Sequence, residues 1–181
     1  MKKKIDLLTS GYVSMDRIIK ISSPARVGFT AIITNQDNAS INFGGCSVNI
    51  AYAGSKLGLC TAPLIRVGGD YEQTGFKDFL EKSGVSLDGV SQLPAETTSC
   101  CYLIENPDGE HITLFYPGAM DEKYCSPPPD SLFAQSRFGV MTVGAKPDNE
   151  AFFEKCRQHD LPMVFGMNFY KRSSLTAASS L

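Results

Sequence analysis

Short apolar runs alternate with amphipathic segments along most of this chain, and this alternation restricts the fold more than any other feature. The runs have the length of single buried strands and occupy residues 5–11, 62–69, 138–144 and 162–168. Segments with apolar residues at helical spacing occupy residues 47–57, 74–83 and 149–159. The alternation predicts an α/β fold, a Rossmann-like parallel sheet with helices on both faces.

Two further β-rich regions interrupt this alternation. Residues 17–43 are rich in Ile, Thr and Phe and are broken by proline and glycine, which predicts edge-type strands joined by turns. Residues 97–119 predict a β-hairpin, because the Pro-Asp-Gly sequence at 107–109 supplies a turn between two β-rich arms. Neither region fits inside a parallel sheet, so we expect both to lie beside it as a small β flap.

A glycine pair, Gly44-Gly45, leads directly into the first predicted helix, with Asn49 in its first turn. Glycine lacks a Cβ, so its backbone N–H groups can approach a ligand beside the partial positive charge of the helix start. Asn49 offers a donor and an acceptor that suit a sugar diol, and Asp16, after the first strand, can accept two hydroxyls. The pattern leaves a second interpretation open, in which the glycines form a plain loop, Asn49 is solvated and Asp16 is a turn residue.

Other residues of these segments have predicted structural roles. Ser47 is expected to cap the first helix and Gly58 to follow its end. Small residues such as Ala51 and Gly54 keep that helix narrow, so that it can lie close to the sheet. Asp70, after the second strand, is expected to cap the next helix.

Composition excludes several classes of function. The chain has 181 residues, which suits one domain, and a net charge of −2, which gives no reason to expect nucleic acid or an anionic membrane as partner. The apolar run after the basic N-terminus is broken by Asp6 and then by residues 9–11, which predicts a cytoplasmic protein rather than a signal peptide, and no apolar window could span a bilayer. The six cysteines form no Cys-x-x-Cys pair and the two histidines lie far apart. We therefore expect no metal site, and small core cysteines in a reducing compartment.

Several motifs, taken in order, resemble those of the ribokinase-like (PfkB) carbohydrate kinases. They are "GYVSMD", "GGCSVNIAYAGSKLG", "PLIRVGGDYEQTG", "ENPDGEH" and "FYPGA". The resemblance extends from about Ile5 to Asn168. It implies a β-sheet lid, formed by residues 17–43 and 97–116, that closes over the substrate and often mediates dimers. It also implies ATP- and Mg²⁺-dependent phosphorylation of a hydroxyl of a small sugar, related polyol or nucleoside.

The resemblance also assigns roles to individual residues. The positions that would hold substrate hydroxyls are Asp16, Gly44, Gly45 and Asn49, and further candidate contacts are Ser14 and Asn168. Cys46 and Ser47 stand where many relatives have lysine and glycine, so the motif does not identify the sugar.

The catalytic base of this family is an Asp in a Gly-Ala-Gly-Asp motif beside the ATP site, and that motif does not occur in the 181 residues. We therefore expect residues 1–181 to form one incomplete, C-terminally truncated ribokinase-like domain with no catalytic residue and few ATP-binding residues. Such a chain should not turn over alone. Its unpaired sheet edge predicts marginal stability or self-association.

Two other classes of function remain for comparison. A non-catalytic module could sense a sugar or dimerise through the lid; saturable sugar binding without a nucleotide effect would identify the sensor. A dinucleotide-binding oxidoreductase is disfavoured, because "GGCSVN" lacks the Gly-x-Gly-x-x-Gly spacing and no acidic residue is suitably placed after the next strand.

Overall fold

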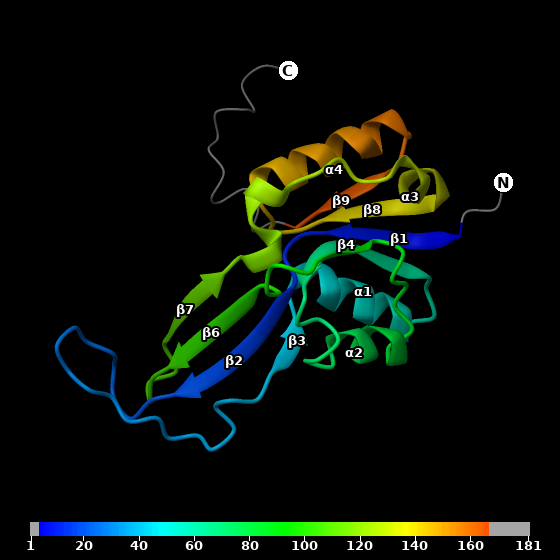
Figure 1. The fold of residues 1–181 in the computed structure, drawn as a ribbon. Helices are drawn as coiled ribbons and strands as arrows, with labels where there is room; N and C mark the ends of the chain where they lie inside the picture. The colour runs from blue at the N-terminus through cyan, green and yellow to red at the C-terminus, as the bar shows by residue number, and fades with distance from the viewer. Residues whose placement is uncertain (1–3, 167–181) are drawn as a thin grey trace.

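The computed structural model describes residues 4–166, which form two sheets set side by side (Figure 1). The larger sheet is parallel and has the strand order β5-β4-β1-β8-β9. Its strands are Ile5–Ser10 (β1), Thr61–Gly68 (β4), Val90–Leu93 (β5), Ser136–Met141 (β8) and Met163–Phe165 (β9). The first strand of the chain is therefore the central one, and the predicted parallel α/β sheet is confirmed.

Helices cover both faces of this sheet (Figure 1). They are Cys46–Lys56 (α1), Phe76–Lys82 (α2), Asp130–Gln135 (α3) and Lys146–Gln158 (α4). On the α1/α2 face, Ile65 and Val67 of β4 pack with Phe76 in one core. On the α3/α4 face, Leu8 of β1 packs with Phe133 in a second core. None of the helices between residues 4 and 166 combines the length and apolarity that crossing a bilayer requires.

The smaller sheet has the order β3-β2-β6-β7 and mixed strand directions. Its strands are Ser14–Lys20 (β2), Asn42–Gly44 (β3), Cys100–Glu105 (β6) and His111–Tyr116 (β7), and we call it the lid sheet. The predicted hairpin joins β6 to β7, with Gly109 in its turn at a φ of 79°. Two short 3-10 helices, Gly118–Met120 (η1) and Glu122–Tyr124 (η2), lead from the lid sheet back to the larger sheet.

Residues 22–41 differ from the prediction, because they form a long irregular loop instead of edge strands. One isolated bridge, between Ile21 and Ile33, joins this loop to the end of β2, and no strand is assigned between residues 22 and 41. The Asn35 side chain accepts from the Lys20 backbone N–H at 2.8 Å and donates to the Ile18 carbonyl at 2.9 Å. Asn35 thus binds backbone groups at the edge of β2 that a neighbouring strand would otherwise bind. This contact explains why the loop forms no strand beside β2 despite its β-rich sequence.

The predicted cap of α1 was wrong. The helix begins at Cys46 after Gly45, and Ser47 is fully buried, with its hydroxyl 2.9 Å from that of Thr9. Ser47 therefore fastens the helix to β1. At the other end, Gly58 follows the helix with a φ of 84°, as predicted.

The prediction that Asp70 caps the next helix was also wrong. Its carboxylate accepts hydrogen bonds from the backbone N–H and the hydroxyl of Thr98, at 2.8 and 2.7 Å. The α2 helix begins later, at Phe76. Asp70 therefore has a structural role, but its carboxylate binds the segment just before β6 rather than the start of a helix.

The cysteines are less buried than predicted. All six are free thiols, and of these only Cys101 and Cys156 are buried, whereas Cys46 and Cys60 are exposed. Burial raises the pKa of the Cys156 thiol to about 12. Cys46 stands at the exposed start of α1 and Cys60 in the connection before β4, so the apolar sequence around them does not place them in the core.

Candidate functional site

A polar cluster lies where the lid sheet meets the start of α1, centred on Gly44. Its side chains are Asp16 from β2 and Asn49 from the first turn of α1. A Cβ on Gly44 would lie 3.3 Å from Asp16 Oδ2 and 3.4 Å from Asn49 Oδ1. Both side chains therefore approach the same point beside Gly44, which has no Cβ to occupy it.

Strand pairing and one hydrogen bond position the Asp16 carboxylate. Ser14 is the register partner of Gly44, and Asp16 is the partner of Asn42. The buried Ser14 hydroxyl donates to Asp16 Oδ1. This leaves Oδ2, the oxygen near Gly44, available to accept from another group. Asp16 is half-buried and Asn49 is exposed, so the cluster opens to solvent.

Gly45 has a different role from Gly44. Its φ is 94°, and a Cβ there would lie 2.3 Å from the Tyr12 carbonyl oxygen and 2.7 Å from the Val13 Cα. Because Gly45 has no side chain, the start of α1 can pack closely against the connection between β1 and β2. This packing fixes the first turn of α1 and, with it, the position of Asn49, whose N–H donates to the Gly45 carbonyl at 2.9 Å.

The narrow face of α1 is confirmed. Ala51 is fully buried, and a Cβ on Gly54 would lie 2.8 Å from Thr61 Cγ2 of β4. A larger residue at position 54 would push the helix away from the sheet and would move Asn49 with it.

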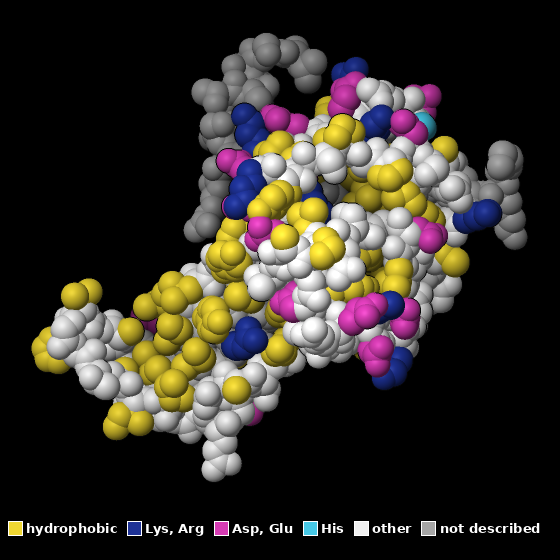
Figure 2. Space-filling view, in the orientation of Figure 1, with side chains coloured by type: hydrophobic (Ala, Val, Ile, Leu, Met, Phe, Trp, Pro, Cys, Tyr) yellow, Lys and Arg dark blue, Asp and Glu magenta, His cyan; other side chains and the backbone are white. Residues whose placement is uncertain are grey.

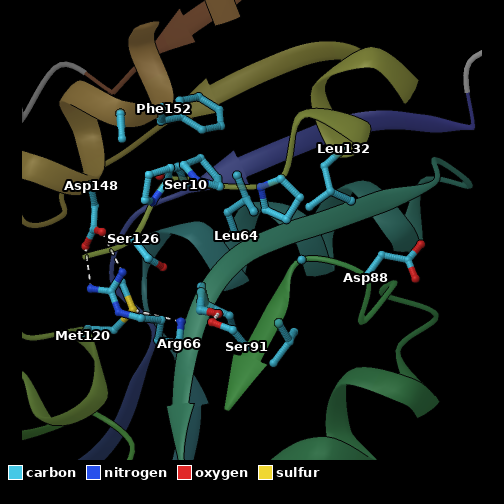
Figure 3. Close-up of a pocket in the computed structure, with 17 residues that line it drawn as sticks. Ser10, Leu64, Arg66, Asp88, Ser91, Met120, Ser126, Leu132, Asp148 and Phe152 are labelled. Carbon is cyan, nitrogen blue, oxygen red and sulfur yellow. Dashed lines mark hydrogen bonds and ion pairs between the residues drawn. The ribbon is translucent and has the colours of Figure 1, made fainter. Parts of the chain in front are cut away.

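A separate cavity of about 300 Å³ lies on the α3/α4 side of β4 (Figure 3). Arg66 of β4 lies at one end of the cavity and forms a bidentate ion pair with Asp148 of α4, with N···O distances of 2.6 and 2.8 Å. Arg66 Nε also donates to the Ala119 carbonyl at 2.8 Å. One guanidinium therefore joins the larger sheet, α4 and the η1 segment that returns from the lid sheet.

The Arg66–Asp148 pair was not predicted from the sequence, since its members are 82 positions apart. One signal could have found it. Arg66 stands inside an apolar strand, where a buried arginine requires a carboxylate partner, and it is only 9% exposed. Burial and the neighbouring Asp148 raise the pKa of the Cys125 thiol to about 11.

Residues 4–166 contain no candidate metal site, because no three His, Cys, Asp or Glu side chains among them lie close enough together to hold an ion. Asn168, a candidate contact from the sequence, lies outside the described residues.

A family model described as pfkB family carbohydrate kinase matches residues 4–179. The chain belongs to this family. The match includes Asp16, Gly44, Gly45 and Asn49, and it confirms the resemblance found in the ordered motifs.

The chain is also similar to a curated protein and to solved structures. The nucleoside kinase of Methanothermobacter thermautotrophicus is 31% identical over 119 residues, 66% of this chain and 38% of that protein. The Burkholderia thailandensis nucleoside kinase in complex with inosine has a TM-score of 0.73 at 22% identity, over 88% of this chain and 51% of that one. Arabidopsis thaliana ribokinase complexed with ribose and ATP has a TM-score of 0.74 at 18% identity, over 91% and 53%.

The chain thus spans about half the length of these two solved structures and 38% of the curated relative. The structural likeness confirms the ribokinase-like fold of the described residues.

Proposed function

We propose that this chain binds the acceptor of an ATP-dependent kinase, a small carbohydrate or nucleoside whose hydroxyl receives the phosphoryl group. The observation that carries the proposal is the convergence of Asp16 Oδ2 and Asn49 Oδ1 on the space beside Gly44. The pfkB family match and the ribose and inosine bound by the Arabidopsis and Burkholderia proteins support the same class of acceptor.

The chemistry of the cluster suits a diol. A carboxylate can accept from two hydroxyls, and hydrogen bonds to a charged group contribute roughly 1.5–3 kcal/mol each. The Ser14 hydroxyl holds Oδ1 of Asp16, so the carboxylate is oriented before the acceptor arrives. Asn49 adds one donor and one acceptor. Gly45 supplies an amide at the helix start, and we assign it to the acceptor on family grounds.

The proposal is confined to acceptor binding. ATP and Mg²⁺ are implied by the family, but the residues at 4–166 offer no group of side chains that fits a divalent ion. We therefore assign no catalytic residue and derive no step through Mg²⁺.

Replacing Asp16 with asparagine should weaken acceptor binding about 10- to 100-fold, because the charged acceptor of two hydroxyl bonds is lost. Isothermal titration calorimetry of the full chain with ribose and with inosine measures this. Asp108→Asn, in the exposed hairpin turn, is the matched control and should leave both affinities unchanged. Unchanged binding by the Asp16→Asn protein would refute the proposed function.

Dimerisation through the lid sheet is a second proposed function, favoured by its exposed apolar surface (Figure 2). Ile112, Leu114 and Tyr116 alternate along β7 on the face opposite Asp16, and they are 47%, 51% and 51% exposed. Their register partners Ile104 and Tyr102 extend the same face. Apolar patches of this kind mark interaction surfaces in soluble proteins.

We expect the full chain to sediment as a dimer at micromolar concentration and Leu114→Asp to sediment as a monomer, because a buried unpaired carboxylate opposes association. Thr113→Asp places the same charge on the opposite face of β7 and should leave the dimer intact. A wild-type chain that sediments as a monomer would exclude this second function and leave the first untouched.

A further inference from the structure

The cavity on the α3/α4 side of β4 is a second candidate site (Figure 3). Its volume of about 300 Å³ is in the range of small-molecule sites and far exceeds the space that one water needs. The exposed residues Asp88 and Ser91 belong to its lining, so the cavity is open to solvent at β5. The acceptor cluster lies at the start of α1, which covers the opposite face of the larger sheet, so the two sites are separate.

Strand alternation directs the side chain of Ser10 into this cavity. The preceding residue of β1, Thr9, bonds to Ser47 of α1 on the opposite face, so Ser10 points to the α3/α4 face. Ser10 is only 4% exposed and lines the cavity. Its carbonyl accepts from the Thr142 hydroxyl at 2.8 Å, but its own hydroxyl bonds to no group between residues 4 and 166. This buried hydroxyl is therefore available to a ligand.

The rest of the lining is mostly apolar. Leu64 of β4, Leu132 of α3 and Phe152 of α4 contribute side chains, and the three prolines at 127–129 contribute the connection before α3. Leu132 and Phe152 belong to the core between α3, α4 and the sheet and are 5% and 1% exposed. An organic group that enters the cavity is therefore removed from water, which favours a ligand with an apolar body.

The charged residues of the lining favour a neutral ligand. At one end the Arg66 guanidinium and the Asp148 carboxylate are 2.6 Å apart and neutralise each other, so neither offers an unpaired charge. Asp88 also lines the cavity but is exposed, so water and salt screen its charge. A charged ligand group would lose its hydration in the apolar part of the cavity without gaining a buried counter-ion.

We propose that this cavity binds a neutral amphipathic alcohol, whose hydroxyl bonds to Ser10 and whose apolar body packs against Leu64, Leu132 and Phe152. A ligand hydroxyl can both donate to the Ser10 hydroxyl and accept from it. Met120 of η1 also lines the cavity, so the bound alcohol contacts the segment that returns from the lid sheet. The inference concerns a second site and does not depend on the proposed function of the acceptor cluster.

Methyl NMR of the full chain titrated with 2-phenylethanol tests this assignment. The methyl signals of Leu64, Met120 and Leu132 should shift saturably, with a dissociation constant of about 1 mM or tighter. Those of Leu57, which is 82% exposed at the end of α1, should not shift. Phenylacetate and 2-phenylethylamine present the same ring with a negative and a positive charge. Both should bind at least about 10 times more weakly, because the cavity provides no counter-ion for them.

Two pairs of variants locate the probe. Ser10→Ala should weaken binding of 2-phenylethanol about 2- to 10-fold, since one hydrogen bond is lost. Ser131→Ala, at an exposed position of α3, is its matched control and should bind like the wild type. Ala151→Phe should fill the cavity and abolish binding, whereas Ala134→Phe adds the same ring at an exposed position and should not. If Ala151→Phe does not fold, Ala151→Val replaces it and should weaken binding.

The possible results separate this site from the acceptor cluster. Absence of saturable shifts at the three cavity methyl groups, or unchanged binding by the Ala151 variant, overturns the site. Equal affinities for the three compounds overturn the assignment of a neutral ligand. Asp16→Asn should bind 2-phenylethanol like the wild type, and weaker binding would place the probe in the acceptor cluster instead. Each of these failures leaves the proposed acceptor function to its own test with ribose and inosine.

Discussion

Replacing Arg66 with methionine should destabilise the fold by about 3–5 kcal/mol, because the substitution leaves the Asp148 carboxylate buried without its partner. The Arg66 and Asp148 side chains are only 10% and 11% exposed, so the pair is largely shielded from solvent. The Ala119 carbonyl would lose its donor as well. Urea unfolding followed by circular dichroism measures the change in the free energy of unfolding.

Two further variants make this experiment specific. Lys82→Met breaks the surface pair with Asp78, whose side chains are 79% and 66% exposed, and should leave the unfolding curve unchanged. The double variant Arg66→Met, Asp148→Leu removes both charges and should recover most of the lost stability. A single variant as stable as the wild type would show that the pair does not hold β4, α4 and η1 together.

Gly45→Ala should also cost about 3–5 kcal/mol, since a side chain at that position combines backbone strain with a steric clash. The φ of 94° is unfavourable for alanine, and the new Cβ would lie 2.3 Å from the Tyr12 carbonyl oxygen. The clash is with backbone on both sides, so no side-chain rotation can relieve it. Thermal and denaturant unfolding of the purified variant measure the loss.

The control for this variant is Gly58→Ala, at the other end of the same helix. Gly58 also has a positive φ, 84°, but a Cβ there would meet no atom within 4 Å. It should lose only the conformational term, about 1–2 kcal/mol. Equal losses in the two variants would mean that the tight contact with Tyr12 contributes nothing to the position of α1.

Local patterns predicted the elements whose residues carry their own signal. The strands β1, β4, β8 and β9, the helices α1, α2 and α4, and the β6–β7 hairpin all follow from periodicity or turn chemistry. The strand β5 and the helix α3 were missed. They are only 4 and 6 residues long, so they are too short for periodicity to stand out from neighbouring turns.

The candidate site also contains residues that the sequence identified and contacts that it did not. Asp16, Gly44 and Asn49 were singled out by the sequence, because chemistry beside strand ends and helix starts is visible locally. What the sequence could not supply is contact between distant segments. The burial of Ser47 against Thr9 and the grip of Asp70 on Thr98 both depend on register and packing.

The central position of β1 also constrains how the protein is made. This strand is synthesised before the other strands of the larger sheet, yet its two neighbours are residues 61–64 and 136–141. The apolar strand β1 therefore lacks one of its two neighbours until more than two thirds of the described sequence has been translated. During that time it is exposed to incorrect association. The larger sheet closes late through pairings of long sequence separation, which makes its formation slow compared with that of the hairpin.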